Sequence, residues 1–102
     1  MYAVLRRNSF DLAKLAEYST QLEEFDRIHA SQPGFAGNIV VDLGSGRRFM
    51  VNLWQSEDAG KAAFERLMPA VNRLLMPLLS APSEFVGAGP VIAEASGEDA
   101  GG

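Results

Sequence analysis

Two side chains with useful chemistry lie two residues apart in an apolar segment: Asn52 and Trp54. In a strand this spacing places both on one face. An indole offers a flat wall for stacking on a planar molecule and one N–H donor. A buried amide beside it needs a partner, either a backbone group or a ligand. The pair predicts a site for a planar, partly polar molecule, although Trp54 equally fits an ordinary core position.

His29 is the only histidine of the chain. A neutral imidazole close to Trp54 could take a proton from a phenol or an enol, with a titration at about pH 6 to 7. The alternative is a surface or boundary residue that interacts with the dipole at the end of a helix. Asn52, Trp54 and His29 are the predicted catalytic residues.

Three apolar residues, Met50, Phe64 and Met68, are predicted to line the same pocket and bind the substrate; the methionines are pliable enough to serve as cavity filler. Gly60 is unexpected in a helix, where glycine costs about 1 kcal/mol relative to alanine. It makes room either for a ligand or for the sheet.

The composition excludes several classes of function. The chain has 102 residues, a net charge of -4, one histidine and no cysteine. The acidic balance argues against nucleic-acid binding. Because the chain has no cysteine, disulfides and thiolate sites are excluded, and its single histidine excludes a multi-histidine metal centre. No flavin, nicotinamide or metal motif is present, so no cofactor is expected. Without a membrane-length apolar run or a signal-peptide pattern, the expected location is cytoplasmic.

The elements that must position these residues follow from periodicity. Residues 1–8 read as a strand, and a helix capped by Ser9 carries a stripe of apolar residues that ends at His29. Strands at 38–43 and 47–55 form a hairpin around Gly44–Gly46, which lacks the context of a phosphate loop. Ser56 caps a second helix, with a kink or a break expected at Pro69 and Pro77.

A fourth strand is expected within 83–95, around 85–86 and resuming at 91–92, bent or bulged by residues 87–90. The order strand, helix, strand, strand, helix, strand predicts an α+β, ferredoxin-like βαββαβ fold. In it the third strand lies between the first and second, and two helices cover one face of a four-stranded antiparallel sheet. Residues 1–95 form the single domain, and 96–102 are expected to be a flexible acidic tail.

The third strand predicts a partner because both of its faces carry large apolar side chains. Two helices cover only one face, and monomers avoid an uncovered apolar patch of this extent. A homodimer packed sheet to sheet is therefore expected. Arg6–Arg7 and Arg47–Arg48 should meet at one end of the sheet, either to gather an anion or as a solvated rim paired with acids.

Two segments, QPGFAG at 32–37 and VNLWQSEDA at 51–59, resemble the antibiotic-biosynthesis monooxygenase family of the dimeric α/β-barrel superfamily. The resemblance in layout covers residues 1–93. It implies a cavity between sheet and helices lined by Trp54. Some polyketide oxygenases of that family carry an asparagine four residues before this tryptophan, where the present chain has Met50. Haem-degrading members carry a histidine on the second helix, and residues 57–79 contain none.

The resemblance implies a cofactor-independent monooxygenase that acts with O2 on a small planar aromatic or polyketide-like substrate. The alternative is a non-enzymatic, ligand-binding or stress-associated dimeric barrel. A haem-degrading monooxygenase ranks third.

Overall fold

The computed structural model describes residues 1–97. The strands are β1 Tyr2–Ser9, β2 Phe35–Gly44, β3 Arg47–Trp54 and β4 Glu84–Pro90, and the helices are α1 Leu12–Glu17, α2 Ser19–Ala30 and α3 Glu57–Ala70. A π-helical turn, η1 Val71–Leu75, and a 3₁₀ turn, η2 Met76–Leu78, follow α3. The strands form one antiparallel sheet in the order β2-β3-β1-β4. The predicted ferredoxin-like fold is therefore confirmed.

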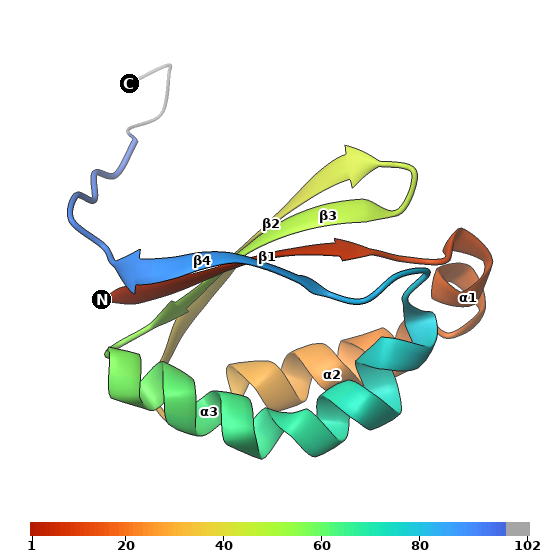
Figure 1. Ribbon diagram of the computed structural model, residues 1–102, viewed down its shortest axis with the longest axis horizontal. Coiled ribbons are helices and arrows are strands. Elements are labelled where there is room, and N and C mark those ends of the chain that lie inside the picture. Colours follow the sequence, from red (N-terminus) through yellow and green to blue (C-terminus); the bar gives the residue numbers. More distant parts are fainter. Residues whose placement is uncertain (98–102) are drawn as a thin grey trace.

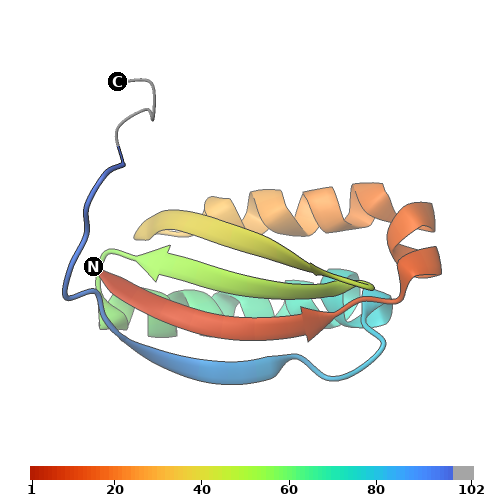
Figure 2. The same ribbon diagram turned by 90° about the horizontal axis from the view of Figure 1, so that it is seen from above.

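The helices α2 and α3 lie on one side of the sheet and run along it, whereas α1 lies beyond the end of β1 (Figures 1 and 2). Two apolar clusters join the layers. One consists of Phe10, Phe25, Ala70, Leu74, Leu75 and Leu78. The other consists of Trp54, Ala63 and Leu67. Among residues 1–97, no helix is long and apolar enough to cross a membrane.

The first helix differs from its prediction. Ser9 is not its cap, because Ser9 still pairs with Arg47 in the sheet. Asp11 caps α1 instead, where its Oδ1 accepts a hydrogen bond from the Lys14 N–H at 3.1 Å. The chain then breaks at Tyr18, whose ψ of 36° leaves the helical range, so one predicted helix becomes two.

The second helical segment matches its predicted start. Ser56 caps α3, and its Oγ accepts a hydrogen bond from the Ala59 N–H at 3.1 Å. Pro69 lies inside α3 without ending it, but the chain widens into η1 directly afterwards and tightens into η2 around Pro77. The expected interruption is thus a change of helical pitch.

The hairpin and the last strand agree with expectation in outline. Gly44, Ser45 and Gly46 all have positive φ, which explains the glycines at the reversal. The irregularity in β4 lies opposite the step from Leu5 to Arg6, which pair with Gly87 and Phe85. Residues 87–90, where the bend or bulge was predicted, stay paired with β1. No strand resumes at 91–92, and residues 98–102 of the predicted tail lie outside the described residues.

No helix covers the sheet face that points away from α2 and α3 (Figure 1). Ile39 and Val41 on β2 are 54% and 45% exposed. They lie directly opposite Val51 and Phe49 on β3. Both faces of β3 therefore carry large apolar side chains, as the sequence indicated.

Candidate functional site

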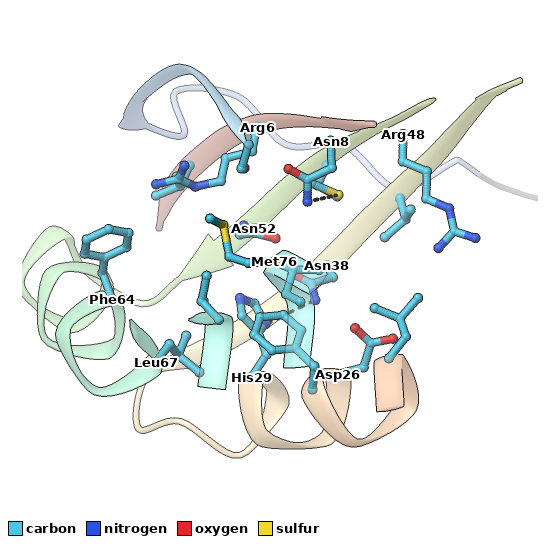
Figure 3. Close-up of a pocket in the computed structure, with 18 of the residues that line it drawn as sticks. Arg6, Asn8, Asp26, His29, Asn38, Arg48, Asn52, Phe64, Leu67 and Met76 are labelled. Carbon is cyan, nitrogen blue, oxygen red and sulfur yellow. Dashed lines mark hydrogen bonds between the residues drawn. The ribbon is translucent and has the colours of Figure 1, made fainter. Parts of the chain in front are cut away.

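A cavity of about 380 Å³ lies between the sheet and the helices. Its walls are mostly apolar and come from β1, β2, β3, α2, α3 and the turns that follow α3. All six site residues expected from the sequence line it: His29, Met50, Asn52, Trp54, Phe64 and Met68. Figure 3 shows polar side chains entering the cavity from both layers. Phe64 is 49% exposed.

Trp54 forms a buried wall and is 3% exposed. Its ring meets those of His29 and Phe35 edge to face, with centroids 5.3 and 5.9 Å apart. Gly60 explains how the indole fits, because a Cβ on Gly60 would lie only 3.1 Å from Trp54 Cδ1. The glycine therefore makes room for the sheet, and the helix holds the indole in place.

Asn52 lies at the centre of the sheet wall. Its cross-strand neighbours are Val4 on β1 and Asn38 on β2, and all three face the cavity. Within residues 1–97 no protein group forms a hydrogen bond with the Asn52 side chain. Because amides need partners in apolar surroundings, this amide is free to bind a ligand.

His29 is buried rather than exposed at a helix end, so the surface alternative is wrong. It is 7% exposed, and Asn38 Nδ2 donates a hydrogen bond to its Nδ1 at 3.3 Å. This contact places the ring proton on Nε2. Burial disfavours the imidazolium and lowers the pKa of His29 to about 4. At neutral pH His29 is therefore an N–H donor, and a weaker base than the sequence suggested.

Asp26 is a site residue that the sequence reasoning missed. It lies one turn before His29 on α2 and lines the cavity. Burial raises its pKa most; Glu23 adds to the increase, and Arg48 opposes it. Figure 3 shows Arg48 extending from the sheet toward Asp26. Its helical spacing from His29, the last residue of the predicted apolar stripe, was the signal that could have identified it.

The four arginines lie at one end of the sheet, as expected, but they are divided between its two faces. Strand alternation places Arg6 and Arg48 on the cavity wall, whereas Arg7 bonds to Glu84 at 3.5 Å and is exposed. The Arg6 guanidinium lies over the rings of Phe64 and Phe85, and that of Arg48 lies over Phe10. Arg6 and Arg48 therefore occupy separate parts of the cavity.

Asn8 was also missed by the sequence reasoning. It is 3% exposed and lines the cavity from β1. Its Nδ2 contacts Met50 Sδ at 3.8 Å, a weak bond, and its Oδ1 has no hydrogen-bond partner among residues 1–97. In the sequence, Asn8 stands at the polar end of a predicted strand, directly before the predicted helix cap, and nothing in this position indicated that its side chain is buried.

The described residues contain no cluster of three or more histidine, aspartate or glutamate side chains that could hold a metal ion. The cavity instead offers N–H donors, three amides, a carboxylate and two guanidinium groups, set among aromatic and aliphatic walls. Such a set can bind and orient an oxygen-bearing aromatic molecule and move a proton from it.

No protein-family model and no curated protein sequence matches this chain. Solved structures do match its fold. A mutant of SnoaB, a cofactor-independent oxygenase from Streptomyces nogalater, has a TM-score of 0.72 at 20% identity, over 91% of this chain and 94% of that one. An antibiotic biosynthesis monooxygenase candidate from Nitrosomonas europaea has a TM-score of 0.71 at 11% identity, over 91% and 100%.

A mutant of MhuD, solved with two manganese protoporphyrin IX molecules per active site, has a TM-score of 0.70 at 17% identity, over 95% of this chain and all of that one. These similarities extend over nearly the whole length of each protein, and two of the three proteins are named as oxygenases or monooxygenases. The chain therefore has the fold of the antibiotic biosynthesis monooxygenases.

Proposed function

We propose that the protein is a cofactor-independent monooxygenase of the antibiotic-biosynthesis type. Its substrate is a small planar aromatic or polyketide-like molecule bound between sheet and helices. The observation that carries this proposal is the cavity of about 380 Å³ with an aromatic wall and unsatisfied polar groups. Its volume falls within the range of about 300–1,000 Å³ that is usual for ligand pockets. The fold shared with SnoaB supports the same reaction class.

The proposed reaction balances without an added reductant. A substrate of the anthrone type has an activated CH2 group. Loss of both hydrogens and gain of one oxygen atom convert it into a carbonyl, and the other oxygen atom leaves as water. The substrate supplies all the electrons, so the protein has to deprotonate, orient and desolvate it.

The cavity residues divide this work. Trp54 supplies an aromatic wall that fixes the plane of the substrate, and Asn52 donates a hydrogen bond to the oxygen that becomes negative on deprotonation. Asp26 is a second candidate base, since burial raises the pKa of its carboxyl above the ordinary value. His29 donates from Nε2, or accepts the proton if the Asn38 amide turns over.

A second copy of the chain is part of this proposal. The uncovered face around Phe49 and Val51 is apolar, and burying it against the same face of another chain would remove the exposed patch. The proposed protein is a homodimer packed sheet to sheet, with residues 1–95 as its domain.

Oxygen uptake with an anthrone or a quinol separates the oxygenase from the alternative, a ligand-binding barrel without turnover. Asn52→Ala should lower kcat more than it raises KM. Asp26→Asn and His29→Gln identify the base, because only loss of the true base removes the acidic limb of the pH–rate profile. Tight binding of these substrates with no oxygen uptake would favour the binding protein. A Soret shift with haemin would instead favour the haem-degrading reading.

A further inference from the structure

Arg6 is a cation on the cavity wall with no assigned task. It lies on β1 directly opposite Met50 on β3 and Phe85 on β4, and it is half-buried. We propose that the ligand carries a carboxylate and that the Arg6 guanidinium binds it. This inference rests on the proposed function only because both use the same cavity. It identifies the substrate class as aromatic carboxylates.

The surroundings of Arg6 leave its N–H groups unused. The guanidinium carbon lies 5.4 Å from the centroid of the Phe64 ring and 5.5 Å from that of Phe85. Aromatic rings attract the cation by their electron-rich faces but do not replace acceptors in the guanidinium plane. Within residues 1–97, no carboxylate lies within 4.0 Å of Arg6, and no acceptor bonds its side chain.

The neighbouring arginines show how unusual this arrangement is. Arg7, the next residue, is exposed and pairs with Glu84 at 3.5 Å. Arg48 is near enough to Asp26 to affect the pKa of that carboxyl. Of these three arginines, Arg6 alone has no protein anion among the described residues. Burial lowers the pKa of Arg6, but the group stays charged and therefore gains from an anion in the cavity.

The chemistry of the site favours a carboxylate over other anions. A guanidinium presents two parallel N–H groups that match the two oxygens of a carboxylate. A phosphate ester would bring close to two negative charges into a cavity that already contains Asp26, in a chain of net charge -4. The rings of Phe64 and Phe85 beside the guanidinium suit an aryl group next to the carboxylate.

Asn8 is a second polar group without a full set of partners on this wall. It lies two residues along the same face of β1, about 7 Å from Arg6, and its enclosed Oδ1 has no donor among residues 1–97. If the ligand displaces the flexible Met50 side chain, a hydroxyl of the ligand would donate a hydrogen bond to Asn8 Oδ1. The matching ligand carries a carboxylate at one end and a hydroxyl about one or two rings away.

The test compares matched probes that differ only in charge. Fluorescence titration of the full chain with 2-naphthoate and with 2-naphthamide should give a dissociation constant about tenfold lower for the carboxylate. Arg6→Met, which keeps the side-chain stem, should abolish this difference. Arg6→Lys should retain a part of it. Arg73→Met, a change at an exposed arginine paired with Glu24, is the matched control and should keep the full difference.

Equal affinity of the two probes for the unchanged protein overturns the proposal, as does a preference that survives Arg6→Met. Failure of both probes to bind at millimolar concentration also overturns it. Tighter binding of 2-naphthyl phosphate than of 2-naphthoate would assign the site to phosphate esters instead. The assay needs no turnover, so a carboxylate preference without oxygen uptake would retain the subsite and refute only the oxygenase.

Discussion

Replacing Asn8 with leucine should stabilise the protein in the absence of a ligand. Asn8 is 3% exposed, and its Oδ1 meets no donor among residues 1–97. A buried acceptor without a partner costs about 1–3 kcal/mol, and the Nδ2 contact with Met50 Sδ returns little at 3.8 Å. Leucine has a similar shape, needs no partner and is better suited to a strand than asparagine. The free energy of unfolding should therefore rise by about 1–2 kcal/mol.

Thermal and urea unfolding of the ligand-free protein measure this change. For a domain of this length, each 1 kcal/mol raises the melting temperature by about 4–8 °C. Asn8→Asp is the matched control, since it places a carboxylate in the same enclosed position and should lower the melting temperature. A lower melting temperature for Asn8→Leu would show that the Asn8 amide is already satisfied in the folded protein, and the argument from its free oxygen would fail.

Four further predictions follow from single contacts. On lowering the pH from 7 to 4, His29 alone should contribute a loss of about 3 kcal/mol of stability, because unfolded His29 takes up a proton near its usual pKa of 6.5 and the buried ring does so only near 4; the difference between the parent and His29→Gln in urea unfolding at the two pH values measures this contribution. Gly60→Ala should lower the melting temperature and shift the tryptophan fluorescence, since the added methyl would press on the indole; an increase would show that the indole moves freely. Val51→Glu should give a light-scattering mass near 11.0 kDa where the parent gives twice that, with Lys61→Glu as the control on an exposed helix face; a monomeric parent would refute the proposed dimer. Truncation after Ala95 should change the melting temperature by no more than about 2 °C, because residues 96–102 contain no large apolar side chain.

The fold was predictable because strand alternation and the turn signals act locally. Gly44–Gly46 and Ser56 fixed the hairpin and the start of α3 without reference to the rest of the chain. The first helix was less predictable because two nearby residues can act as caps. The sheet decided between them by keeping Ser9 paired with Arg47, which left Asp11 to cap the helix.

The site was predictable where a side chain shares a face with an apolar neighbour. Asn52, Trp54 and Met50 alternate along one strand, so the face of one indicates the faces of the others. Asp26 and Asn8 were not predictable in this way, because charged and amide side chains are usually exposed. The burial of Asn8 depends on the enclosure of the cavity by both layers, which no local pattern contains. Asp26 lines the cavity without being buried, and only its helical spacing from His29 indicated this position.

The polar groups of the cavity share a feature that argues for a ligand. Asn8 has an unpartnered oxygen, Arg6 has no protein anion among the described residues, and Asp26 and His29 have pKa values shifted toward their neutral forms by burial. Each of these costs stability in the free protein, and apolar residues of similar size would remove the cost. Proteins concentrate such local costs at functional sites, where binding or catalysis offsets them. One ligand with a flat apolar body, an anionic group and a hydroxyl would give each of these groups a use, and that is the molecule proposed for this cavity.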